Sequence, residues 1–158
     1  MQKPIKRSQH LLHLSKEHHF ELLFCWKIRQ GIKLEVAPDR MVAYIRYFWQ
    51  HFTAVHFKEE ETLLFTDARD VLVQRALAEH AAIKGLITLL TAPGYSTGKQ
   101  ELQALADNID NHVRFEERTL FPHLEQTLPK AQMDRIGQQL NAAPRLADDY
   151  KDEFWVTL

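Results

Sequence analysis

The amino-acid sequence predicts an all-α protein: an up-down-up-down antiparallel four-helix bundle with a short C-terminal helical extension. Apolar residues recur every three or four positions almost throughout the chain, which is the spacing of one helix face. Four such stretches are joined by short connections, and short connections place successive helices antiparallel. Five glycines and six prolines in 158 residues are few for a many-turned β-protein.

The first two predicted helices each follow one apolar stripe. We expect the first over residues 8–30, ended by Gly31. The second is expected over residues 38–65, with a proline in its first turn. Thr66 and Asp67 then form a break and the N-cap of the next helix. The two stripes consist of Leu11, Leu14, Leu22, Cys25 and Ile28, and of Ile45, Trp49, Phe52 and Leu63.

The third and fourth helices are separated by the clearest loop in the sequence, residues 93–98. We expect the third over residues 68–91. The fourth runs to about Gln126, and Thr97 with Gln100 has the spacing of a capping box at its start. The two stripes consist of Ala76, Ile83, Ile87 and Leu90, and of Leu102, Leu105, Ile109 and Leu120.

A fifth, shorter helix is expected to start at Pro129, and the tail beyond Pro144 is expected to be partly helical. We therefore divide the chain into a bundle over residues 1–128 and a C-terminal helical extension over residues 129–158. The extension is expected to pack on the same domain.

The composition excludes several classes of function. Twenty basic and twenty-one acidic residues leave a net charge of −1, so no field of one sign favours nucleic acid or an anionic membrane. The single cysteine, Cys25, excludes an intramolecular disulfide and a Cys-rich zinc or iron–sulfur site. No stretch reaches the roughly 20 apolar residues of a membrane span, and the first ten residues do not resemble a signal peptide. We expect a soluble, cytoplasmic protein.

The nine histidines are the unusual feature of the composition. Each of the four long predicted helices places one histidine on its apolar stripe, and in two helices a glutamate follows four residues later. Residues four apart lie on one helix face, about 6 Å apart along the axis, so one helix can offer an imidazole and a carboxylate to a shared point. These six residues are His18, His56, Glu60, His80, His112 and Glu116.

The chain also repeats itself. The segment HFKEEETLLF at residues 56–65 aligns with HVRFEERTLF at residues 112–121, with the histidine, both glutamates, a leucine and the phenylalanine in common. The pair Glu17-His18 likewise matches Glu79-His80. A helix pair that carries His and then His-x-x-x-Glu therefore occurs twice. Two such pairs would form a pseudo-symmetric, dinuclear ligand set of four histidines and two carboxylates.

The two inward glutamates indicate metal ions. One histidine on an apolar stripe is more often a hydrogen-bonded core residue than a ligand. A buried, unpaired carboxylate costs several kcal/mol, however, and no arginine or lysine continues the stripe beside Glu60 or Glu116. Two metal ions, typically about 3.5–4 Å apart, would supply the positive charge and could share both carboxylates. We therefore predict that the four histidines ligate a metal pair and that the two glutamates bridge it.

These motifs resemble those of the hemerythrin-like, or HHE cation-binding, domains. The resemblance implies a four-helix bundle around a non-haem di-iron centre, with two iron ions bridged by carboxylates. Members of this family variously bind dioxygen, respond to oxygen or nitric oxide, sense iron, or serve in repair of iron–sulfur clusters. The resemblance covers about residues 8–123 and rests on Glu17-His18, His56-x-x-x-Glu60 with Glu61, Glu79-His80, and His112-x-x-x-Glu116 with Glu117, Leu120, Phe121 and Pro122.

Two positions depart from the oxygen-carrying hemerythrins. The oxygen carriers, which this chain resembles, have a further histidine at the position of Lys84. Because this histidine is missing here, we do not expect reversible oxygen carriage. The oxygen carriers also use a carboxylate five residues after the last histidine, which would be Glu117 here. On a regular helix, residue i+5 lies about 140° from residue i, whereas i+4 lies about 40° away. We therefore expect Glu116 as the ligand unless a π-bulge re-aims Glu117.

The other titratable residues are expected to lie outside the centre. The same angular argument places His13, His19 and His51 away from it, and the remaining two histidines lie near helix ends. Lys84 is expected to extend outward, and Cys25 to be a small core residue. The residues assigned to helix ends and solvated faces are His10, His123, Glu59, Glu61 and Glu117.

The leading functional hypothesis is a di-iron protein that binds or senses a small molecule such as dioxygen or nitric oxide. Four imidazoles on two ions leave an open or water-filled position on each. A di-iron oxidase, peroxidase or ferroxidase would use the same open positions. An iron donor in iron–sulfur cluster repair would instead pass metal to a protein partner, and an apo bundle used only for interaction would fold regardless of chelators.

Overall fold

The computed structural model describes residues 6–157, which form seven α-helices and two π-helical segments and contain no strand. The predicted all-α class is therefore confirmed. No helix in this range is both long enough and apolar enough to cross a bilayer. In chain order the elements are α1 Leu12–Lys33, α2 Pro38–Phe48, η1 Trp49–Thr53, α3 Ala54–Leu63, α4 Val71–Leu90, α5 Lys99–Phe115, η2 Glu116–Leu120, α6 Phe121–Thr127 and α7 Lys130–Ala142.

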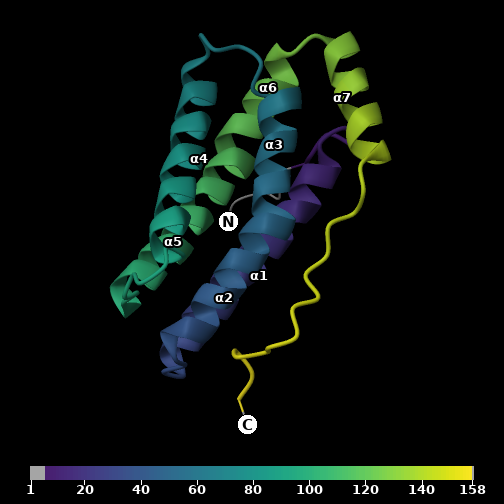
Figure 1. Ribbon diagram of the computed structural model, residues 1–158. Coiled ribbons are helices and arrows are strands. Elements are labelled where there is room, and N and C mark those ends of the chain that lie inside the picture. The colour runs from purple at the N-terminus through teal and green to yellow at the C-terminus, as the bar shows by residue number, and fades with distance from the viewer. Residues whose placement is uncertain (1–5, 158) are drawn as a thin grey trace, which may run out of the picture.

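Four long helical segments lie side by side in Figure 1. They are α1, the continuous run α2–η1–α3, α4, and the continuous run α5–η2–α6. The expected positions of all four are confirmed to within a few residues, but neither π segment was predicted. A π segment inserts one residue into a helix without interrupting it, so it changes which residues face inward further along the chain.

The first helix does not end at Gly31 as predicted but continues to Lys33. The glycine serves close packing instead. A Cβ atom at this position would lie 2.6 Å from Sδ of Met41 and 2.9 Å from the ring of Phe154. Gly31 therefore lets α1 approach both α2 and the C-terminal segment.

The N-cap of α4 is Asp70, not Asp67. The Asp70 carboxylate accepts hydrogen bonds from the backbone N–H groups of Leu72 at 2.9 Å and Val73 at 3.4 Å. His123 contacts its other oxygen at 2.6 Å, in the role near a helix end that was expected of this histidine. Asp67 caps only a turn, because it accepts from the N–H of Arg69.

Replacing Asp70 with alanine should lower the free energy of unfolding by about 1 kcal/mol, because two N–H groups at the start of α4 lose their acceptor. Asp67→Ala is the matched control, since Asp67 is exposed and lies outside the cap, and it should change stability by less than about 0.5 kcal/mol. Urea denaturation of both variants measures the difference. Equal losses in the two variants would contradict the assignment of the cap.

The start of α5 also differs from the expectation. Gly98 is the N-cap, and the Glu101 carboxylate accepts a hydrogen bond from its N–H at 3.3 Å. The Thr97 hydroxyl, predicted to cap this helix, donates instead to the carbonyl of Leu90 at 3.2 Å. The predicted pair of Thr97 with Gln100 is therefore wrong by one residue.

Helix α7 confirms the expected fifth helix, with Pro129 as its N-cap. The chain then forms no helix between residues 143 and 157, so the expectation of a partly helical tail is wrong. The tail instead runs back along the bundle (Figure 1), and side chains hold it there. Lys27 pairs with Asp148 at 2.9 Å, and Arg40 pairs with Asp152 at 2.6 Å. The division of the chain after residue 128 stays a prediction.

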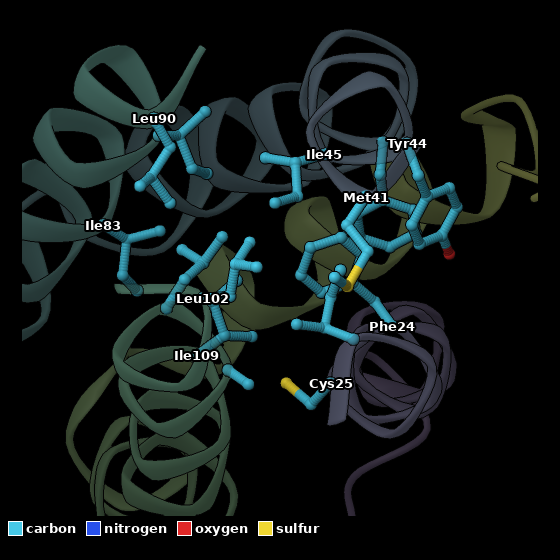
Figure 2. Packing of buried hydrophobic residues seen from close by; sticks show 14 of the residues in the cluster. Phe24, Cys25, Met41, Tyr44, Ile45, Ile83, Leu90, Leu102 and Ile109 are labelled. Atoms are coloured by element: carbon cyan, nitrogen blue, oxygen red, sulfur yellow. The ribbon is translucent and has the colours of Figure 1, made fainter. Parts of the chain in front are cut away.

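The apolar core consists of two clusters. The first fills the bundle where α1, α2, α4 and α5 meet, and Figure 2 shows its packing. It includes Phe24, Met41 and Ile109, and Phe154 of the tail. The second joins the beginnings of α1 and α4 to η2, α6 and α7. Along each long helical segment, residues of one apolar cluster come before the inward histidine and residues of the other cluster come after it. The four histidines therefore lie in a polar layer between the two apolar clusters.

Candidate metal centre

The polar layer consists of the six residues predicted to bind metal. They lie on α1, α3, α4, α5 and the first position of η2. None is more than 3% exposed, so water does not solvate their charges. The structure thus brings together His18, His56, Glu60, His80, His112 and Glu116.

These residues form two groups that share both glutamates. His18 and His56 complete one group, and His80 and His112 complete the other. Within each group the four donor atoms lie within 4.8 Å of one another. Each group could therefore hold one cation, and the two glutamates are common to both groups.

The distances between donor atoms match those around a metal ion. The Nε2 atoms of His56 and His80 lie 3.3 and 3.2 Å from Oε1 of Glu60. The Nε2 atoms of His18 and His112 lie 2.9 and 3.3 Å from Oε1 of Glu116. Neighbouring donors in an octahedral site with bonds of about 2.1 Å lie about 3 Å apart. Each carboxylate therefore contacts histidines of both groups.

Several of these donor atoms have no hydrogen-bond partner in the described part of the chain. They are both oxygens of Glu60, Oε2 of Glu116, and Nε2 of His56, His80 and His112. Every ion-pair partner of the two glutamates within 4.0 Å in residues 6–157 is a histidine. Buried atoms without partners are costly, and cations between them would satisfy all of them. The donor set therefore fits a pair of metal ions.

A ring of outer glutamates holds the four imidazoles. Each histidine donates Nδ1–H to a carboxylate on another helical segment, at 2.7 Å in every case. A hydrogen bond at Nδ1 fixes the tautomer and directs Nε2 inward, as metal-binding histidines require. The pairs are His18 with Glu117, His56 with Glu17, His80 with Glu61, and His112 with Glu79.

This ring corrects the expectation that Glu61 and Glu117 belong to solvated faces. Both are partly accessible, with side chains 44% and 28% exposed, but each carboxylate contacts an inner histidine. The residue beside an inward side chain points toward the neighbouring helix, where the next histidine lies. The sequence signal was present, since every long helix carries a glutamate directly beside an inner donor.

The charges of the centre are strongly coupled. Burial lowers the pKa of His80, but the adjacent carboxylates of Glu116 and Glu60 outweigh burial and raise that pKa to about 10. Burial and the charge of Glu116 raise the pKa of Glu60, but the imidazoles of His56 and His18 together outweigh them and hold it at about 2. The pKa of His18 and of His56 is also raised well above the ordinary value. The buried carboxylates therefore stabilise positive charge at the centre.

The π segment η2 begins at Glu116, next to the centre. It does not re-aim the following residue toward the centre. Glu116 belongs to both donor groups, whereas Glu117 contacts the outer nitrogen of His18 and the hydroxyl of Ser15 at 2.8 Å. The structure therefore places Glu116 among the inner donors.

Comparison with known families agrees with this geometry. A sequence profile of the hemerythrin HHE cation-binding domain matches residues 8–124. The chain belongs to the hemerythrin family. No curated protein and no solved structure gives a significant match to it. Membership in a cation-binding family agrees with the two clusters of buried donors.

One buried acidic residue beside the centre of this hemerythrin-family chain was not predicted from the sequence. Glu21 is 1% exposed, and its Oε1 lies 3.1 Å from Nε2 of His56. Burial raises its pKa, although the charges of His56 and His18 oppose this effect. The signal was its position three residues after His18, on the same helix face.

The other histidines of the hemerythrin domain lie outside the inner layer, as expected. His19 and His51 are exposed, and His10 pairs with Asp134 at 3.1 Å. His13 lies behind the centre, where its Nε2 is 3.1 Å from Glu17 and 3.2 Å from Glu59. Glu59 is therefore partly buried rather than solvated as predicted, while Lys84 and Cys25 have the expected exposed and buried positions.

Replacing Glu79 with alanine should weaken metal binding by about 10- to 100-fold, because the His112 imidazole loses the carboxylate that orients it. Isothermal titration with Co²⁺ measures the change. Lys84→Ala is the control, since Lys84 is exposed one turn after His80 on the same helix. Unchanged affinity in the Glu79 variant would show that the outer ring does not support the centre.

Proposed function

We propose that this hemerythrin-family protein holds a non-haem di-iron centre with bridging carboxylates. His18 and His56 ligate one iron ion, His80 and His112 ligate the other, and Glu60 and Glu116 bridge the two. The observation that supports this most directly is the pair of donor groups with two glutamates in common. Imidazole and carboxylate suit iron, manganese and zinc, and the family favours iron.

The proposal includes the arrangement of the bundle. The four long segments are proposed to form an up-down-up-down antiparallel four-helix bundle, because the connections between them are short. Each helix then supplies its inner histidine at the same level of the bundle. We also propose that the protein is located in the cytoplasm.

Binding or sensing of a small molecule is the proposed activity. Two imidazoles and two shared carboxylates leave an iron ion short of six donors, so a position remains for dioxygen or nitric oxide. The bound iron pair supplies one-electron redox chemistry at that position. The protein orients the imidazoles through the outer glutamates and excludes bulk water with the two apolar clusters.

Elemental analysis after iron-replete expression tests the proposal, together with an anaerobic optical spectrum before and after exposure to air. Two iron ions per chain and the charge-transfer absorption of a bridged ferric pair are expected. A single zinc ion, or no metal, would overturn the proposal. Steady turnover of peroxide or ferrous iron would favour the oxidase or peroxidase alternative. Transfer of iron to an apo iron–sulfur protein would favour the donor alternative.

A further inference from the structure

Glu21 breaks the two-fold symmetry of the centre. The internal repeat aligns Glu17-His18 on α1 with Glu79-His80 on α4, so the counterpart of Glu21 is Ile83. Both side chains are 1% exposed. The α1 half of the protein therefore buries a carboxylate at the position where the α4 half buries a hydrocarbon side chain.

Glu21 lies beside the donor group of His18 and His56 and is not satisfied as a hydrogen-bonded core residue would be. Neither carboxylate oxygen makes a hydrogen bond with any of the described residues. The distance of 3.1 Å between its Oε1 and Nε2 of His56 equals the separation of neighbouring donors around one ion, about 3 Å. A buried carboxylate without donors is costly, and a cation beside it removes that cost.

We propose that Glu21 is an additional ligand of the ion held by His18 and His56, and that the position open to a small molecule belongs to the ion held by His80 and His112. This inference rests on the proposed di-iron function. The first ion then has five protein donors, two imidazoles and three carboxylates. The second has only four, two imidazoles and the two shared carboxylates, and is therefore the more open of the two. The two ions are inequivalent despite the repeat.

The surface of the protein agrees with this assignment. A surface cavity of about 680 Å³ has both His112 and Ile83 in its wall. A second cavity of about 360 Å³ includes His80 and Phe57. On the α1 side, a cavity of about 310 Å³ includes Glu17 but neither inner histidine of that half. A small molecule therefore has the shorter approach to the ion beside Ile83.

Mössbauer spectroscopy of protein loaded with ⁵⁷Fe tests the ligand assignment. The unmodified protein should give two different iron doublets of equal area. In Glu21→Leu one doublet should shift toward the other, and one of the two ions should bind at least about tenfold more weakly. Glu21→Gln keeps the size of the side chain and should weaken the same ion. Cys25→Ala, one turn further along the buried face of α1, is the control and should change neither doublet.

Azide, a small anion that binds open iron positions, tests the second half of the proposal. It should alter the doublet that Glu21→Leu leaves unchanged. If azide alters the doublet that depends on Glu21, the open position belongs to the other ion and the assignment is wrong.

The outcomes separate this inference from the proposed function. If the unmodified protein binds two iron ions but neither Glu21 variant changes a doublet or an affinity, only the inference fails. If the unmodified protein binds fewer than two iron ions, both fail. Circular dichroism checks that each variant is folded, and the Gln variant decides the test if the Leu variant is not.

Discussion

Replacing Glu60 with alanine should reduce the bound iron from two ions per chain to fewer than one. The Glu60 carboxylate contacts Nε2 of His56, of His80 and, at 3.6 Å, of His18. It therefore belongs to both donor groups, and its loss removes a donor and a negative charge from each ion at once. Two cations a few ångströms apart repel each other strongly when a bridging charge is missing.

Elemental analysis after desalting measures this effect, and Glu59→Ala is the matched control. Glu59 is the preceding residue, but its carboxylate contacts His13 rather than the inner histidines, so this variant should keep both ions. Glu60→Gln keeps the shape of the side chain and should also lose metal, because the amide carries no charge. Full retention of two ions in Glu60→Ala would show that Glu60 is not a bridge.

Removal of the metal should lower the free energy of unfolding by about 5 to 8 kcal/mol. A ligand that binds only the folded state adds about 2.7 kcal/mol at 100 times its Kd and about 4.1 kcal/mol at 1,000 times, and here two ions contribute. The metal-free protein should nevertheless fold, because the inner imidazoles pair with the carboxylates around them. Urea denaturation with and without a strong chelator measures the difference.

Glu60→Ala provides the control for this experiment. Because the variant has little metal to lose, the chelator should change its stability by less than about 1 kcal/mol. Identical denaturation curves of the unmodified protein with and without chelator would mean that the ions do not contribute to folding. The bundle would then be structural in the absence of metal.

The inner donors could be predicted from the sequence because helical periodicity describes the face of a single helix. His56 and Glu60 share a face by spacing alone, and the structure places both at the centre. Glu21 was missed for a different reason. Its spacing of three residues from His18 places it on the inward helix face, but a charged residue is usually solvent-exposed, so the spacing alone did not predict that it is buried.

Contacts between two helices could not be predicted from the periodicity of apolar residues, which describes one helix at a time. The bond of Glu117 to His18 joins residues 99 positions apart, and it depends on how α1 and η2 are turned toward each other. The tail was missed because contacts such as that of Lys27 with Asp148, rather than local hydrogen bonds, determine its path. The π segments have no sequence pattern of their own.

The hydrogen bonds of the outer glutamates connect the two halves of the internal repeat. Two of these hydrogen bonds each stay within a single half of the repeat: His56 with Glu17 in the first half, and His112 with Glu79 in the second. The other two join the halves: each half supplies a glutamate to a histidine of the other, His18 to Glu117 and His80 to Glu61. This reciprocity is the rule of a symmetric dimer interface, in which residue i contacts j and j contacts i. A half-length chain could thus complete the centre only as a homodimer, and the full chain has the form of such a dimer fused into one polypeptide.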